Sequence, residues 1–150
     1  MNLTLEPETI LWPETNYVFL EKTGPILQIA RQAWQEVHRL EALISEHNQI
    51  TGVLSLYRMD PATYRAGYIL AAPPVKLPAA LRYEHLGSAR YLKFVLTGSY
   101  ANLPQASGRV WEYVSRNDIL VRPDFAIERY ANDPKSTPED ELITEILVPI

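Results

Sequence analysis

Apolar residues recur three or four positions apart along one long segment of the chain, beginning at Ile26. This spacing predicts a helix with a single buried stripe, which we expect to end near Glu46-His47-Asn48. Gly24-Pro25 stands directly before the segment and is typical of a turn that leads into a helix. The stripe consists of Ile26, Ile29, Ala30, Ala33, Val37, Leu40 and Ile44.

Three β-rich runs surround this helix. One run, Tyr17 to Lys22, precedes it, and two others, Val53 to Tyr57 and Tyr64 to Ala71, follow it. The last two flank the turn Met59-Asp60-Pro61-Ala62, whose residues favour a hairpin with a longer loop. The first half of the chain is therefore predicted to form a strand, a helix and two further strands.

The second half repeats this order after a proline-rich connector at residues 72–81. Tyr17 to Gly24 returns as Tyr91 to Gly98 at an offset of 74 residues, and Tyr57 to Pro61 returns as Tyr130 to Pro134 at an offset of 73. The duplication predicts a second copy of the same unit. Its elements are strands at 81–86 and 91–97, a helix at about 104–117, and strands at 125–130 and 142–148.

Two strand-helix-strand-strand units predict an α+β fold with a pseudo-two-fold duplication, in which antiparallel sheets carry helices on one face only. We expect a single domain over residues 1–150, with a first repeat at about 1–74 and a second at about 80–150. Repeats that pack together form a seam, and ligand pockets tend to form at such seams.

The strand that begins at Phe125 alternates apolar and polar residues. Phe125 and Ile127 fall on one side, which we expect to face the helix, while Glu128 and Tyr130 fall on the other. The equivalent strand of the first half has Ser55 where the second has Glu128. The predicted helix-free surface therefore carries one carboxylate rather than two.

Composition narrows the class of protein. The chain has 150 residues, of which 47% are hydrophobic and 21% are charged, as is typical of one soluble folded domain. It has no cysteine, which excludes disulfides and thiolate metal ligands and favours a cytoplasmic location.

No apolar run has the length of a signal peptide or a membrane span, so we expect no membrane partner. A net charge of −4 with scattered Lys and Arg argues against direct nucleic-acid binding and favours a cation as a charged partner.

Several segments of the second half resemble one known family. The segments are Arg90-Tyr91 through Thr97-Gly98-Ser99-Tyr100, Glu128-Arg129-Tyr130-Ala131-Asn132-Asp133-Pro134, Thr137-Pro138-Glu139-Asp140-Glu141-Leu142, Thr144-Glu145-Ile146 and Pro149-Ile150. Together they resemble the GyrI-like small-molecule-binding family, which has an SHS2-type duplicated fold. Its members include gyrase-inhibitory proteins and the effector-binding domains of multidrug-responsive bacterial transcription regulators.

The resemblance implies a central ligand groove formed by the helix-free faces of the two repeats. In the family this groove binds flat, apolar and often cationic molecules against aromatic walls, and its central glutamate matches Glu128 here. Tyr130 shares the face of Glu128, and Tyr57 is its counterpart in the first repeat, so we expect the two tyrosines to face each other. Further candidates for the aromatic walls are Tyr68, Phe19 and Trp111.

Each candidate also has a purely structural interpretation. On its own, Glu128 would be typical of a solvated strand residue, and Tyr57 and Tyr130 would be typical of any strand. Trp111 lies beside the apolar stripe of the second helix and suits a core position, as Trp34 does in the first helix. The resemblance is therefore what favours a binding site.

The sequence predicts no metal and no cofactor. His38, His47 and His85 lack the spacing of metal ligands, both among themselves and with carboxylates. The chain contains no glycine-rich phosphate loop and no Gly-x-Ser-x-Gly element, which excludes the common nucleotide-binding and serine-hydrolase classes.

Two functions of different class follow from these observations. The first is binding or sequestration of amphipathic aromatic, often cationic, small molecules beside Glu128. The second, implied by the resemblance, is hydrolysis of cyclopropane-containing alkylating natural products. In that reaction Glu128 would act as a general base on water, helped by Tyr130, Tyr57 or Tyr68. Contact with DNA gyrase is a third alternative, which only the family name suggests.

Overall fold

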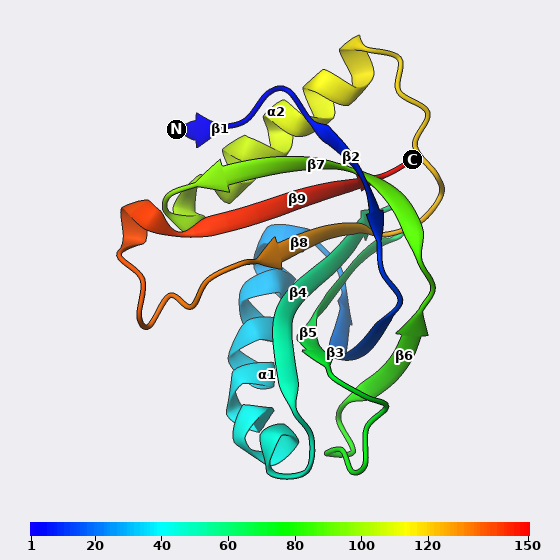
Figure 1. Cartoon of the computed structure of the whole chain (residues 1–150), viewed down its shortest axis with the longest axis vertical. Helices are drawn as coiled ribbons and strands as arrows, with labels where there is room; N and C mark the ends of the chain where they lie inside the picture. Colours follow the sequence, from blue (N-terminus) through cyan, green and yellow to red (C-terminus); the bar gives the residue numbers. More distant parts are fainter. The chain divides into compact units, whose positions relative to one another are not determined.

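A computed structural model describes residues 1–150, and it confirms the α+β fold with antiparallel strand pairing. The chain forms two compact units. Residues 13–88 make up one of them, which we call the continuous unit, and residues 1–12 together with 89–150 make up the other, which we call the split unit. Each unit contains one long helix and one antiparallel sheet (Figure 1).

The sheet of the continuous unit has four strands in the order β4-β5-β3-β6. Helix α1 lies against β3 and β5 because its apolar stripe, which includes Ile29, Ala33 and Val37, is buried there. Gly67 of β5 pairs with Phe19 so closely that no side chain fits between the two backbones. The elements are β3 (Thr15–Thr23), α1 (Ile26–His47), β4 (Ile50–Met59), β5 (Ala62–Leu70) and β6 (Arg82–Leu86).

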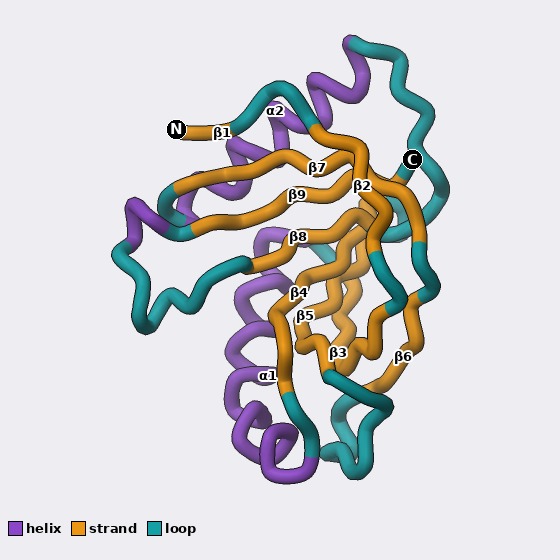
Figure 2. The backbone as a smooth tube through the Cα atoms, in the orientation of Figure 1, coloured by secondary structure: helices purple, strands orange, loops and turns teal.

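The sheet of the split unit has the order β8-β9-β7, and both β1 and β2 pair with the remaining edge of β7. Two long loops, one between α2 and β8 and the other between β8 and β9, complete the unit (Figure 2). The elements are β1 (Asn2–Leu3), β2 (Glu8–Trp12), β7 (Ala89–Thr97), the 3-10 turn η1 (Tyr100–Asn102), α2 (Leu103–Arg116), β8 (Ala126–Tyr130), the 3-10 turn η2 (Glu139–Glu141) and β9 (Ile143–Pro149).

Helix α2 covers one side of this sheet. Its buried residues Ala106, Val110 and Val114 form a single core cluster with Phe94 of β7 and Ile146 of β9. This cluster therefore identifies which side chains of β7 and β9 face the helix. No helix of the structure has the combination of length and hydropathy that crossing a bilayer requires.

The duplication predicted from the sequence is visible in the backbone. Gly24 after β3 and Gly98 after β7 adopt φ angles of +133° and +124°, a region that L side chains rarely enter. The predicted helices and the main strands of both copies are confirmed. Strands β1 and β2 were not expected, and the outermost strands are exchanged. Strand β2 precedes β3 in the chain but pairs with β7, while β6 precedes β7 but pairs with β3.

Candidate functional site

Strand register places Glu128 on the side of the sheet that α2 covers. Glu128 is paired with Ile146, and Ile146 is paired with Phe94, so the three side chains point to the same face. Ile146 and Phe94 belong to the core cluster beneath α2. The expectation that Glu128 faces the helix-free side is therefore wrong.

The physical reason for this error is that both faces of β8 are buried. Ile127, which we expected on the helix side, pairs with Leu147 on the opposite face, and the two are 1% and 0% exposed. Alternation fixes only that Ile127 and Glu128 point in opposite directions. Hydrophobicity could not decide which of the two directions leads to the helix.

Glu128 is a buried carboxyl group without a basic partner. Its residue is 9% exposed, and no Lys, Arg or His forms an ion pair with it. Burial raises its pKa to about 7, and a hydrogen bond that the Tyr130 hydroxyl donates to Oε2 over 3.5 Å opposes this rise. The carboxyl group is therefore half-protonated near neutral pH instead of near pH 4.5.

Tyr130 is the link between Glu128 and the end of the sheet. Its ring meets that of Tyr100 edge to face, with ring centroids 5.4 Å apart and an interplanar angle of 70°. Its cross-strand partner is Thr144, which is completely buried. The Thr144 Oγ1 atom has no hydrogen-bond partner. The α2 side of this sheet therefore combines a carboxyl group, two tyrosine rings and a buried hydroxyl group.

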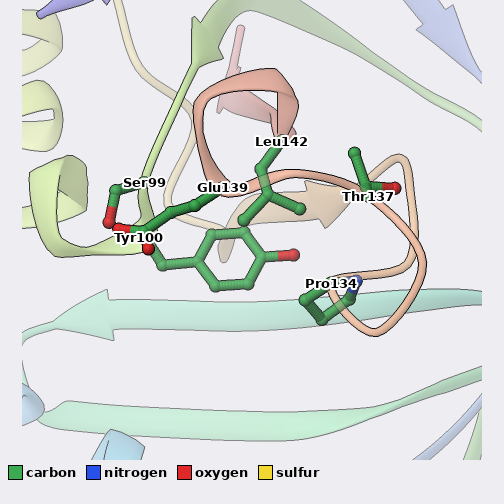
Figure 3. A pocket seen from close by; sticks show the side chains of 6 residues that line it. All are labelled: Ser99, Tyr100, Pro134, Thr137, Glu139 and Leu142. Carbon is green, nitrogen blue, oxygen red and sulfur yellow. The ribbon is translucent and has the colours of Figure 1, made fainter.

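An open pocket of about 250 Å³ lies beside Tyr100, at the end of the same sheet. Figure 3 shows the Tyr100 ring extending below Leu142 toward Pro134 and Thr137. Burial and the charge of Asp133 raise the pKa of Tyr100, so its hydroxyl group stays protonated at neutral pH. The lining residues are Ser99, Tyr100, Pro134, Thr137, Glu139 and Leu142.

In the continuous unit, a hydrogen-bonded cluster occupies the α1 side of the sheet. The Trp34 Nε1 group donates to Ser55 Oγ at 3.2 Å and to the Tyr64 hydroxyl at 2.8 Å, and these two oxygens are 2.6 Å apart. Tyr57 pairs with Tyr64 and lies on the same side. Ser55, the counterpart of Glu128, thus faces the helix of its own unit as Glu128 does.

Tyr68 is also on the α1 side. Its hydroxyl group is 3.1 Å from His38 Nδ1, and Trp34 approaches its ring edge to face with centroids 6.4 Å apart. Burial, followed by the charge of Glu41, raises the pKa of Tyr68 well above 10. The Tyr68 hydroxyl is therefore available as a neutral hydrogen-bonding group and not as a phenolate.

The structure places Phe19 on the opposite face of the sheet from Tyr57 and Tyr68. Phe19 pairs with Gly67 on the opposite face of the sheet, stacks on Tyr17 and is covered by Arg65, whose guanidinium carbon lies 4.3 Å from the ring centroid. Arg65 is held there by ion pairs with Glu21 and Glu84. Phe19 is thus packed in an ion-pair network on the face without the helix.

Trp111 is part of α2 and packs, half-buried, against the core cluster of the split unit. Sequence reasoning had not selected Tyr100 or Thr144 as site residues. Thr144 could have been placed on the face of Glu128 only with the register of β8 and β9, because its position two residues before Ile146 gives its face but not its neighbours. The chain brings together no group of three or more His, Asp or Glu side chains suited to a metal ion.

Comparison with known proteins identifies a family. The model of the family described as GyrI-like small molecule binding domain matches residues 5–150. A search among proteins of curated function gives no match.

Solved structures share the fold at low sequence identity. The chain superposes on EcmrR in its cryo-EM complex with DNA with a TM-score of 0.77 and 13% identity over 96% of its own length, and it spans 56% of the EcmrR chain. It superposes on SAV2435 bound to tetraphenylphosphonium with a TM-score of 0.73 and 18% identity, covering 96% of this chain and 93% of that one. For a hydrolase from Listeria innocua the TM-score is 0.61 at 10% identity, covering 97% and 92%.

Proposed function

This chain belongs to the GyrI-like family of small-molecule binding domains, and we propose that its ligands are amphipathic aromatic cations that bind beside Glu128. The observation that carries the proposal is the buried, unpaired carboxyl group of Glu128. A carboxylate without a counter-ion is costly in an apolar environment, and a bound cation relieves that cost. A cationic ligand can therefore act as the counter-ion of the Glu128 carboxylate.

The aromatic side chains around Glu128 suit the same class of ligand. Tyr130 and Tyr100 present ring faces and edges, and ring faces attract cations by about 0.5–2 kcal/mol without demanding a particular hydrogen-bond geometry. Such surfaces tolerate ligands of different shape. The tetraphenylphosphonium bound to SAV2435 is a cation of this chemical class, which supports the proposal for this chain.

Titration with tetraphenylphosphonium tests the role of Glu128. We expect the wild-type protein to bind it, and Glu128→Gln to weaken binding about tenfold or more, which corresponds to about 1.4 kcal/mol. Glu145→Gln is the matched control, since Glu145 lies in the same sheet but pairs with Lys93 and Arg129 on the other face. Equal affinities of the wild type and Glu128→Gln would refute the assigned role.

The same titration at several pH values gives a second, independent readout. Protons compete with the cation for Glu128, whose pKa is about 7 in the free protein. Affinity should be constant well above pH 7, fall as the pH drops through 7 and then level off near the affinity of Glu128→Gln, because the protonated carboxyl group is neutral like glutamine and tetraphenylphosphonium itself does not titrate. Glu128→Gln should show no such dependence between pH 5.5 and pH 8.

Hydrolysis is the second candidate, and one observation favours it specifically. A carboxyl group with a pKa of about 7 is suited to general-base catalysis near neutral pH, and the Tyr130 hydroxyl lies 3.5 Å from it. The fold shared with a hydrolase from Listeria innocua is compatible with such an activity. Incubation with a cyclopropane-containing alkylating natural product separates the two functions, because a hydrolase releases the ring-opened product and a binding protein returns the compound unchanged.

A further inference from the structure

Thr144 carries a polar atom that the folded chain leaves unused. Its side chain is 0% exposed, and its Oγ1 atom neither donates nor accepts a hydrogen bond within the protein. Buried hydroxyl groups almost always have a partner, since burial without one forfeits the hydrogen bonds made to water. Valine would fill the same space without this cost, so the hydroxyl group calls for an explanation other than packing.

The position of Thr144 supplies that explanation. Thr144 pairs with Tyr130, and the next residue of β9 on the same face, Ile146, pairs with Glu128. The buried hydroxyl and the buried carboxyl are therefore diagonal neighbours on one face, where Cα atoms are about 7–8 Å apart. A ligand whose cationic group binds Glu128 would therefore have Thr144 as its nearest unpartnered polar group on that face.

The pocket beside Tyr100 extends the same row of side chains. Leu142, which lines the pocket, stands two residues before Thr144 in extended backbone directly before β9, and a step of two residues in a strand covers about 6.7 Å. The pocket, Thr144 and Glu128 thus follow one another along one side of the sheet. The aromatic ring of Tyr100 lies at the pocket end and the carboxyl group at the other.

We propose that Thr144 is a specificity-determining contact of the ligand site, which therefore prefers protonated aromatic amines that carry a hydroxyl or carbonyl group a few bonds from the nitrogen. This inference rests on the proposed function of Glu128. The ammonium group binds Glu128, the neighbouring oxygen forms a hydrogen bond with Thr144 Oγ1, and the aromatic part extends over Tyr100 into the pocket. A cation without a hydrogen-bonding group uses Glu128 and the rings alone.

A matched pair of amines tests this preference. Propranolol has a hydroxyl group two carbons from its amine, and an analogue without the hydroxyl has the same charge and the same naphthyl ring. Isothermal titration calorimetry at pH 8 should give an affinity about tenfold higher for propranolol than for the analogue with the wild-type protein. Thr144→Val should bind both amines with the affinity of the analogue, while Thr144→Ser should keep the preference.

Tetraphenylphosphonium separates failure of this inference from failure of the proposed function. Thr144→Val should bind tetraphenylphosphonium as the wild type does, because that ligand cannot form a hydrogen bond.

The inference is overturned if the wild type binds both amines equally, if propranolol does not bind to protein that binds tetraphenylphosphonium, or if Thr144→Val weakens the binding of all three ligands alike. If Thr144→Val does not fold, Thr144→Ala replaces it, with the difference between the two amines as the same readout. Unchanged tetraphenylphosphonium binding in Glu128→Gln would instead refute the proposed function.

Discussion

At the scale of the residue, the burial of Glu128 makes the stability of the protein depend on pH. The folded state has a pKa of about 7 at this position, whereas the ordinary value is 4.5. Between these two values the folded chain binds more protons than the unfolded chain. The free energy of unfolding is therefore not reduced by Glu128 below pH 4.5, and it falls as the pH rises to about 7. A difference of this size corresponds to about 3 kcal/mol.

Glu128→Gln should remove this loss. We expect the variant to have a free energy of unfolding about 2–3 kcal/mol above that of the wild type at pH 8 and equal to it near pH 4, because glutamine resembles the protonated carboxyl group and still accepts from Tyr130. Urea unfolding at a series of pH values measures the difference. Glu145→Gln provides the control, and a difference for Glu128→Gln that does not vary with pH would contradict the raised pKa.

At the scale of the element, the sequence predicts most helix and strand boundaries, but it does not predict which face of a strand lies against the helix. The helix expected from Ile26 to about residue 46 is α1, because one apolar stripe on a long segment has only one compatible structure. Strand β2 was not predicted because its mostly exposed residues show no alternation typical of a buried strand. Its partner β7 also lies about 80 residues later in the sequence, so no local signal indicates the pairing. Glu128 and Tyr130 were selected correctly as neighbours on one face, but the contacts of that face depend on register.

Strand pairing in the continuous unit should be especially sensitive at Gly67. A Cβ atom at this position would collide with the Val18 carbonyl oxygen and would stand 2.8 Å from the Phe19 Cα atom. Backbone atoms cannot yield as a flexible side chain can, so Gly67→Ala should cost at least about 2 kcal/mol of stability.

Gly108→Ala is the matched comparison for that experiment. Gly108 is exposed in α2 and an added Cβ atom meets no neighbour, so this change should stabilise the protein by about 0.5–1 kcal/mol. Thermal or urea unfolding of both variants measures the contrast. A Gly67→Ala protein as stable as the wild type would show that β3 and β5 are not packed as described.

At the scale of the whole molecule, the exchanged strands determine which segments depend on each other. Strands β1 and β2 pair only with β7, so removal of residues 1–12 exposes one edge of the split unit and leaves the strand pairs of residues 13–88 intact. Neither the duplication nor the composition predicted this exchange, because both copies offer a similar edge to an incoming strand. Pairing between distant segments is a property of the folded chain and has no local signal.

Deletion of residues 1–12 should therefore act unequally on the two units. Hydrogen exchange followed by mass spectrometry should show faster exchange in β7 and in α2, which packs on the same sheet, and little change in β3 and β5. Trp12→Ala, which removes one buried side chain and keeps the β2 backbone, should produce a smaller effect of the same pattern. Uniform acceleration across both units would contradict the division described above.

The exchange of β2 also affects the order in which strands can pair during synthesis. Residues 8–12 leave the ribosome before any part of the continuous unit, yet their partner, residues 89–93 of β7, is made only after residues 13–88 are complete. Because domains generally fold as units during translation, the continuous unit can close while the first strand waits without a partner. We therefore expect the middle of the duplicated chain to fold first and residues 8–12 to pair with β7 only afterwards.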